Sequence, residues 1–241
     1  MIKILSSLAA PVCQSAGLSS EAQGLVTSQQ TPAQYVSTLE NNGLQRDATK
    51  FMVYGMSEKD AVCYAAKSAQ KAVDPANLAD QEAIKAAQAW MKTPGEVTQK
   101  AATEAAGKAD LSTPGAWAAQ AAAWAQTPPG GAAVPGAPNL TQHAAFGAIQ
   151  LAAASPSARA QALTQMAQAR AEAAARTLAE EVAVPGVPAV PQVQVPAVTA
   201  PAVPAVPAVE EMTALARSKT AGAFQPYCEI GKGIANGTCT C

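Results

Sequence analysis

The sequence contains little charge, few aromatic side chains and a single histidine. Charged residues make up 14% of the 241 residues and aromatic residues 4%, whereas about a quarter of the residues of an average globular protein are charged. The 16 Lys and Arg residues and the 17 Asp and Glu residues give a formal net charge of -1, without a basic block. Because nucleic-acid binding requires a basic surface, we expect no nucleic-acid partner.

Long apolar runs are also missing. No stretch reaches the 18 or more strongly apolar residues that a membrane-spanning helix requires, so we expect no transmembrane segment. The apolar stretch at the N-terminus is interrupted by Ser6 and Ser7 and ends at Pro11, which argues against a cleaved secretory signal. The five cysteines are an odd number without regular spacing, which indicates a reducing, cytoplasmic location rather than a disulfide scaffold.

Alanine is what the sequence has in excess, at about a quarter of all residues. Alanine is depleted in strands and buries little area per residue, so this bias favours thin helices that pack closely. We therefore predict an all-α fold, an irregular bundle of about seven or eight short helices, followed by a Pro-rich extended linker and a short C-terminal β-hairpin.

Helix starts are marked by capping patterns. Three Thr-Pro pairs, which begin at Thr31, Thr93 and Thr113, predict a threonine N-cap followed by proline in the first helical position. Ser57 is expected to cap a helix that runs to about residue 73, and a further helix is expected over residues 78–91. Thr141 is expected to cap another that runs to about residue 153, followed by a helix over residues 157–181.

Few large residues are available to anchor such a bundle. We interpret Trp90, Trp117 and Trp124 as core anchors, because Trp117 and Trp124 lie seven residues apart and therefore on one side of a helix. Cys63 lies on an alanine-rich helix face, where it is most simply a small core residue.

The composition changes along the chain and divides it into four parts. We predict an N-terminal segment over residues 1–18, a helical domain over 19–183, a linker over 184–209 and a C-terminal segment over 210–241. The linker holds seven prolines among Ala and Val, a composition that favours an extended polyproline II spacer.

The C-terminal segment carries a turn signal, Asn236-Gly237, between residues able to extend. This pair is typical of the type I′ turn of a β-hairpin, and an isolated hairpin is only marginally stable in water. We therefore expect the hairpin to join a sheet edge of another protein by strand addition. The residues expected to bind this partner are Ile234, Asn236, Gly237, Cys239 and Cys241.

Residues able to carry out catalysis are scarce. His143 is the only histidine and has no identifiable partner, and no phosphate-binding loop or hydrolase motif occurs, so we predict no enzymatic activity. Cys228, Cys239 and Cys241 are weak candidates for zinc binding, because zinc prefers thiolates. They lack a fourth ligand and the usual C-x2-C spacing. We therefore expect no cofactor, with zinc at these cysteines as the alternative.

Three short patterns occur within residues 31–182. They are the stretch from Lys59 to Ala66, Ala87-Gln88-Ala89-Trp90 followed by Thr93-Pro94, and Thr113 to Trp117. With these patterns, residues 31–182 resemble a bacterial Ala-rich helical family of unknown function. Members of that family tend to be encoded beside type VI secretion components. The tail GIANGTCTC is similar to the opening of PAAR-like spike-tip domains but is too short for a whole one, so the chain is either truncated or completes another protein's sheet.

Together these resemblances imply a non-enzymatic adaptor or cargo-associated protein of a type VI secretion system. Its helical domain would bind a spike, effector or chaperone protein, and its tail would dock by strand addition. The alternative is an immunity or inhibitor protein that neutralises a toxin through its helical surface. A cytoplasmic location is expected, with export alongside the apparatus left open.

Overall fold

All regular structure in the described part of the chain is helical, which confirms the predicted all-α bundle. A computed structural model describes residues 4–125, 139–154 and 209–238, with side chains in the last stretch from residue 222 onward. The helix expected over 157–181 and the linker residues 184–208 lie outside these ranges. The helices are α1 (Ala9–Ala16), α2 (Ser20–Gly24), α3 (Pro32–Asn41), α4 (Gln45–Gly55), α5 (Glu58–Ala72), α6 (Leu78–Lys92), α7 (Glu96–Lys108), α8 (Pro114–Trp124), α9 (Leu140–Ala154) and α11 (Val209–Ala235).

Three of the expected helix starts are confirmed. Thr31 and Thr113 cap α3 and α8, each followed by proline in the first turn. Ser57 caps α5, and its hydroxyl oxygen accepts a hydrogen bond from the Asp60 N–H at 3.2 Å. Local sequence therefore determines these three starts, because each cap needs only residues within one turn.

Two other expected caps are wrong. The N–H of Thr93 donates to the Ala89 carbonyl at 3.0 Å, so Thr93 closes the last turn of α6, and α7 begins at Glu96. Thr141 lies inside α9, which begins at Leu140. Its hydroxyl donates to a Glu58 carboxylate oxygen at 3.3 Å, so the side chain bonds a neighbouring helix.

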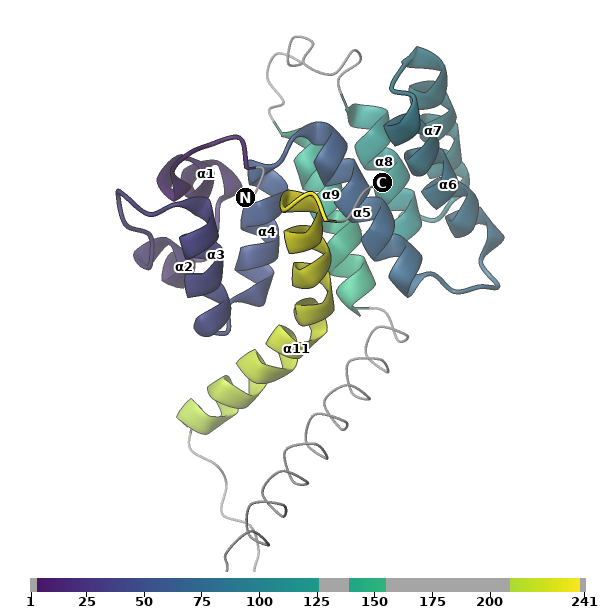
Figure 1. Ribbon diagram of the computed structural model, residues 1–241. Coiled ribbons are helices and arrows are strands. Elements are labelled where there is room, and N and C mark those ends of the chain that lie inside the picture. The colour runs from purple at the N-terminus through teal and green to yellow at the C-terminus, as the bar shows by residue number, and fades with distance from the viewer. Residues whose placement is uncertain (1–3, 126–138, 155–208, 239–241) are drawn as a thin grey trace, which may run out of the picture.

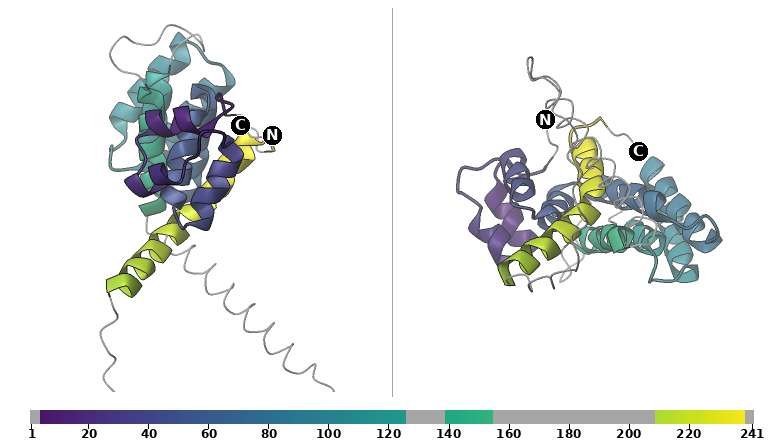
Figure 2. Two further views of the ribbon diagram at one scale, coloured as in Figure 1. Left: turned by 90° about the vertical axis from the view of Figure 1, so that its left-hand side faces the viewer. Right: turned by 90° about the horizontal axis from the view of Figure 1, so that it is seen from below.

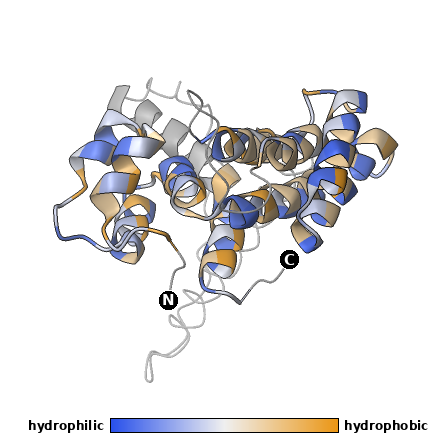
Figure 3. Ribbon diagram, turned by 90° about the horizontal axis from the view of Figure 1, so that it is seen from above, coloured by the Kyte–Doolittle hydropathy of each residue, from blue (hydrophilic) through white to orange (hydrophobic). Residues whose placement is uncertain are grey.

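The helices form two end groups around a central layer (Figure 1). Helices α1 to α3 lie at one end and α6 to α8 at the other, with α4, α5 and α9 between them. Helix α5 packs against α6, α8, α9 and α11. Coloured by hydropathy, the helices in the middle of the molecule are largely apolar and those at the edges carry hydrophilic stretches (Figure 3). Helix α5 thus connects the α6 to α8 group with α9 and α11.

Two clusters of buried residues have different compositions. The larger cluster, here called the large-residue core, includes Tyr35, Phe51, Met52, Tyr64 and Trp90 and takes in residues from α1 to α11. Trp90 is completely buried there, as predicted. The smaller cluster, here called the alanine seam, lies between α6, α7 and α8. Its buried members are alanines only: Ala83, Ala106, Ala109, Ala116 and Ala119.

The prediction that Trp124 anchors the core is wrong, because this side chain is 38% exposed. Helix α8 buries only alanine and glycine residues, which occupy its inward faces and leave the tryptophans at its margins. Trp117 is partly buried and packs at the edge of the core, where its ring lies against Gly147 and its Nε1–H donates to the Leu111 carbonyl at 2.6 Å. Small residues rather than tryptophans therefore hold α8 in place.

A buried carboxylate joins α6 to the beginning of α8. Asp80 Oδ1 accepts a hydrogen bond from the Ala116 N–H at 3.1 Å. A Cβ atom at Gly115 would overlap the Asp80 carboxylate and lie 2.5 Å from the Asp80 carbonyl oxygen. This close approach requires glycine at position 115, and it brings the backbones of the two helices together.

Candidate functional site: docking of the C-terminal helix

The C-terminal segment is helical up to Ala235, so the predicted β-hairpin is wrong in the residues that the structure describes. Gly237 has a left-handed φ of 71°. Its N–H donates to the Ile234 carbonyl and the Thr238 N–H donates to the Gly233 carbonyl, both at 3.0 Å. These bonds form a Schellman motif, the usual glycine-containing end of a helix. Asn236-Gly237 therefore ends α11 instead of turning a hairpin.

The structure places the expected partner-binding residues in different environments. Ile234 is buried in the large-residue core, whereas Asn236 and Gly237 are exposed at the end of α11. Cys239 and Cys241 lie outside the described residues. In the structure, residues 234–235 belong to α11 and residues 236–237 end it, so these residues do not have the extended conformation that strand addition requires.

A helical signal is present in the same stretch of sequence. Phe224, Tyr227, Cys228, Ile234 and Ala235 are buried, and their spacings of three, four and seven residues place them on one helix face. The hairpin prediction rested on Asn236-Gly237 alone. The helical spacing of the apolar residues over 224–235 would have predicted the helix.

This buried face of α11 lies against α4, α5 and α9. The helix is bent and contains Pro226, and its first half extends away from the other helices (Figures 1 and 2). Proline removes one helical hydrogen bond and clashes with the preceding turn, which is a usual cause of such a bend. The part of α11 that docks begins at Phe224, close to Pro226, and continues to the end of the helix.

Two tyrosines connect α11 to α5 and α9. The Tyr64 hydroxyl on α5 donates to the Tyr227 carbonyl at 2.7 Å, and the Tyr227 hydroxyl donates to the Ala152 carbonyl near the end of α9 at 3.1 Å. A Cβ at Gly231 would lie 2.7 Å from atoms of the Tyr64 ring, so glycine is needed for this approach. Burial raises the pKa of Tyr227 to about 12 and that of Tyr64 well above its usual value.

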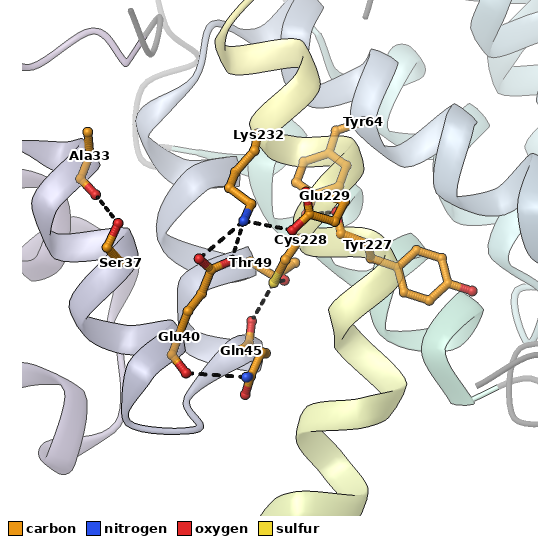
Figure 4. A network of polar contacts seen from close by, with 10 residues as sticks. All are labelled: Ala33, Ser37, Glu40, Gln45, Thr49, Tyr64, Tyr227, Cys228, Glu229 and Lys232. Atoms are coloured by element: carbon orange, nitrogen blue, oxygen red, sulfur yellow. Dashed lines mark hydrogen bonds and ion pairs between the residues drawn. The ribbon is translucent and has the colours of Figure 1, made fainter. Parts of the chain in front are cut away.

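Cys228 is a buried thiol at the centre of the contact with α4 (Figure 4). Its Sγ lies 3.1 Å from the Thr49 hydroxyl and donates to the Gln45 carbonyl at 3.3 Å. Burial raises the pKa of this thiol to about 12, despite a hydrogen bond from Thr49 that lowers it. Metal binding and nucleophilic attack both require the thiolate, so this environment suits a structural thiol rather than a reactive one.

An ion-pair cluster lies at the rim of the same contact. Lys232 Nζ lies 3.1 Å from Glu40 Oε1 on α3 and 2.7 Å from Glu229 Oε1 on α11 (Figure 4). Burial alone lowers the pKa of Lys232, but the hydrogen bonds to Glu229 and Glu40 outweigh it and raise the pKa. Because the cluster is partly exposed, it orients α11 more than it stabilises the fold.

The remaining candidates lie apart from this contact. His143 is exposed, and its Nδ1 lies 3.5 Å from the Tyr54 hydroxyl. Cys63 is buried, as expected of a core residue, but it is disulfide-bonded, whereas Cys13 and Cys228 are free thiols. Within residues 4–125, 139–154 and 209–238, no three His, Cys, Asp or Glu side chains are grouped to hold a metal ion.

Exposed large apolar side chains are concentrated on α6 to α8. Of the five such residues in the described chain, four lie on these helices or the connection between them, namely Leu78, Val97, Leu111 and Trp124. Gln99 Nε2 donates to the carbonyls of Ala123 and Ala125, at 2.9 and 2.7 Å, which brings the start of α7 to the end of α8. Val97 and Trp124 are therefore at the same end of this helix group.

None of the described helices could cross a lipid bilayer. In comparisons with known proteins, residues 35–174 match the model of DUF6931, a family of unknown function. No curated protein and no solved structure matches the chain.

Proposed function

The chain belongs to the DUF6931 family, whose model matches more than half of it, and on this premise we propose that it is a non-enzymatic adaptor of a bacterial type VI secretion system. Its helical domain binds a spike, effector or chaperone protein. The chain resides in the cytoplasm, with export alongside the apparatus as the alternative. The resemblance of residues 31–182 to helical proteins encoded beside such systems supports the choice of apparatus.

The main support for the adaptor function is the grouping of exposed apolar side chains on α6 to α8. Val97 is 83% exposed and lies at the end of the group where Trp124 is also exposed. Single exposed apolar residues are normal, but several on one part of a surface mark interaction sites. Tryptophan is also enriched among residues that dominate binding energy.

We therefore assign partner binding to the exposed surface around Val97 and Trp124, rather than to the tail. This surface is here called the Val97–Trp124 end. In the described structure, the second half of α11 is buried against the body of the same chain, so it is not available as a free docking strand. The main contacts of α11 are with α4, α5 and α9, whereas Val97 and Trp124 lie on α7 and α8 and are exposed while α11 is docked.

A binding experiment with purified components tests the proposal. The full chain is titrated against the spike-tip protein, an effector and a chaperone from the same host apparatus. We expect one of them to bind, and a Val97→Asp, Trp124→Ser double variant to weaken that binding at least tenfold. Leu5→Asp is the matched control, because Leu5 is 78% exposed but lies outside α6 to α8.

Binding to none of these three proteins, or equal binding by the double variant, contradicts the adaptor proposal. If the chain instead binds only a toxic effector and abolishes its toxicity in cells, the immunity function replaces it. Circular dichroism of each variant shows that a loss of binding is not a loss of fold.

A further inference from the structure

The only histidine of the chain and the only arginine whose side chain is described lie on two neighbouring helices. Arg46, Lys50 and Tyr54 follow one another at intervals of four residues on α4, so they share one face of that helix. His143 and Phe146 are three residues apart on α9, which packs against α4. Polar and charged groups are therefore concentrated on this helix pair, in a chain that has little charge overall.

Contacts across the two helices gather these side chains around one ring. The Arg46 guanidinium carbon lies 5.6 Å from the centroid of the Phe146 ring, and Lys50 Nζ lies 5.8 Å from the same point. One turn further along α4, the Tyr54 hydroxyl lies 3.5 Å from His143 Nδ1. Arg46 and His143 are exposed, and Lys50 and Tyr54 are partly exposed. These four residues are here called the basic patch.

The two cations of the basic patch are held close together although they repel each other. Like charges four residues apart destabilise a helix. Burial lowers the pKa of Lys50, and the positive charge of Arg46 lowers it further, whereas Asp47 acts in the opposite direction. The Asp47 carboxylate is engaged elsewhere, because the N–H and the hydroxyl of Ser19 donate to it at 2.9 and 3.1 Å. A negative group bound at the basic patch would relieve the repulsion.

The cations are also positioned for binding before a ligand arrives. Lys50 Nζ donates to the Gly17 carbonyl at 2.7 Å, and its contact with the Phe146 ring orients it further. A side chain that is already ordered loses less entropy on binding. Arg46 carries five N–H donors, so it can bind a carboxylate of another molecule in addition to its contacts within the chain.

We infer that the basic patch binds an acidic helix of a partner protein, through two carboxylates four residues apart that pair with Arg46 and Lys50. Side chains four residues apart on any helix have Cβ atoms about 5–6 Å apart, so the spacing of the carboxylates matches that of the two cations. Arginine also binds carboxylates through two parallel hydrogen bonds. A nucleic acid fits less well, because its binding depends on the neutralisation of many phosphates.

This surface is separate from the one that carries the adaptor function. The basic patch lies on α4 and α9, whereas Val97 and Trp124 lie on α7 and α8. The inference therefore goes beyond the proposed function and does not require it. A Val97→Asp, Trp124→Ser variant should bind an acidic helix as tightly as the wild-type chain does, so the failure of one proposal can be distinguished from the failure of the other.

Two designed peptides test the inference on the full chain. The first is a stapled, Ala-rich helical peptide labelled with fluorescein, with pairs of Glu four residues apart. The second has Gln at the same positions. Fluorescence anisotropy at about 20 mM NaCl should show at least about tenfold tighter binding of the Glu peptide. This difference should shrink at about 300 mM NaCl, because salt screens exposed charges.

Variants of the chain locate the binding. Arg46→Gln with Lys50→Gln should weaken the binding of the Glu peptide at least about tenfold, because both charge pairs are lost. Lys85→Gln with Lys92→Gln is the matched control. It removes the same charge from exposed positions on α6, and should change the affinity by less than about twofold. Circular dichroism of each variant shows that its fold is retained.

Three results overturn the inference. They are equal binding of the Glu and Gln peptides, an equal loss of binding in the control variant, and no binding of either peptide at low salt. Tighter binding of a DNA duplex or of inorganic phosphate than of the Glu peptide, lost in the Arg46 and Lys50 variant, overturns it as well. If that variant does not fold, the comparison of the two peptides and its salt dependence in the wild-type chain decide.

Discussion

The large-residue core and the alanine seam are built in opposite ways. In the large-residue core, Tyr35 and Phe51 meet edge to face with ring centroids 4.9 Å apart, and Tyr64 and Trp90 are fully buried. In the alanine seam, the buried apolar contact is made by alanine methyl groups. Burial free energy scales with apolar area, so each residue of the seam contributes little.

The difference shows that helices can pack firmly without large side chains if their backbones approach closely. The seam achieves this approach with Gly115 and with the Asp80 cap on α8. The large-residue core instead depends on area. Removal of atoms should therefore be most harmful in the large-residue core, and addition of atoms should be most harmful in the seam.

The largest expected effect is from truncation in the large-residue core. Phe51→Ala removes a fully buried ring and its contact with Tyr35, and should lower the free energy of unfolding by about 3–5 kcal/mol. Urea denaturation monitored by circular dichroism measures this change. A decrease in the free energy of unfolding below about 1 kcal/mol would show that the large-residue core readjusts around the cavity. The contrast with the alanine seam would then be lost.

An intermediate effect on stability is expected from a larger side chain in the alanine seam. Ala119→Leu inserts three carbon atoms where Ala119 is fully buried, and should cost about 1–3 kcal/mol through strain and helix displacement. Ala101→Leu on the exposed side of α7 is the matched control and should change stability by less than about 0.5 kcal/mol. Equal stability of the two variants would mean that the seam is loosely packed.

The third prediction concerns alkaline pH, where the stability of the two regions should differ most. The variant that tests it, Tyr227→Phe, should have the smallest effect of the three at neutral pH. The folded-state pKa values of Cys228 and Tyr227 are both about 12, above their usual values of 9.0 and 10.0, because of burial. Their contribution to stability is therefore complete below about pH 9 and is lost as the pH rises toward 12. Each group adds a slope of up to about 1.4 kcal/mol per pH unit.

Tyr227→Phe should remove one such slope, measured as the unfolding free energy between pH 8 and 11. It should also lose a modest amount of stability at pH 7, because the Ala152 carbonyl loses its hydrogen bond. An unchanged slope would show that Tyr227 is not desolvated by the docking of α11. Ala119→Leu serves as the reference, since the seam contains no such group and the slope should stay at its wild-type value.

Local patterns predicted the parts of the fold that depend on a few neighbouring residues. The caps at Thr31, Ser57 and Thr113 were predictable because cap and partner lie within one turn. The Thr93-Pro94 pair was wrongly predicted to begin a helix. Pro94 lies two residues before α7, and in the sequence such a proline cannot be distinguished from one in the first helical turn. At Trp124, a seven-residue spacing specified one side of α8 but not which side the neighbouring helices cover.

The C-terminal helix shows where short-range reasoning fails most. Asn-Gly supplies residues that tolerate left-handed φ, and both a type I′ turn and a helix end require them. Only the partners of Tyr227 and Cys228 on α5, α9 and α4 distinguish the two. These contacts join residues far apart in sequence, so no local pattern contains them.

The long sequence separation of these contacts also affects the order of folding during synthesis. Tyr64 and Tyr227 are 163 positions apart. At about 5–20 residues per second, a ribosome takes roughly 8–33 s to reach Tyr227 after Tyr64. Hydrogen exchange on stalled chains that end before residue 209 should show faster exchange in α4 and α5 than in the released protein. During that interval, the nascent chain presents to chaperones an apolar surface that the finished protein covers with its own last helix.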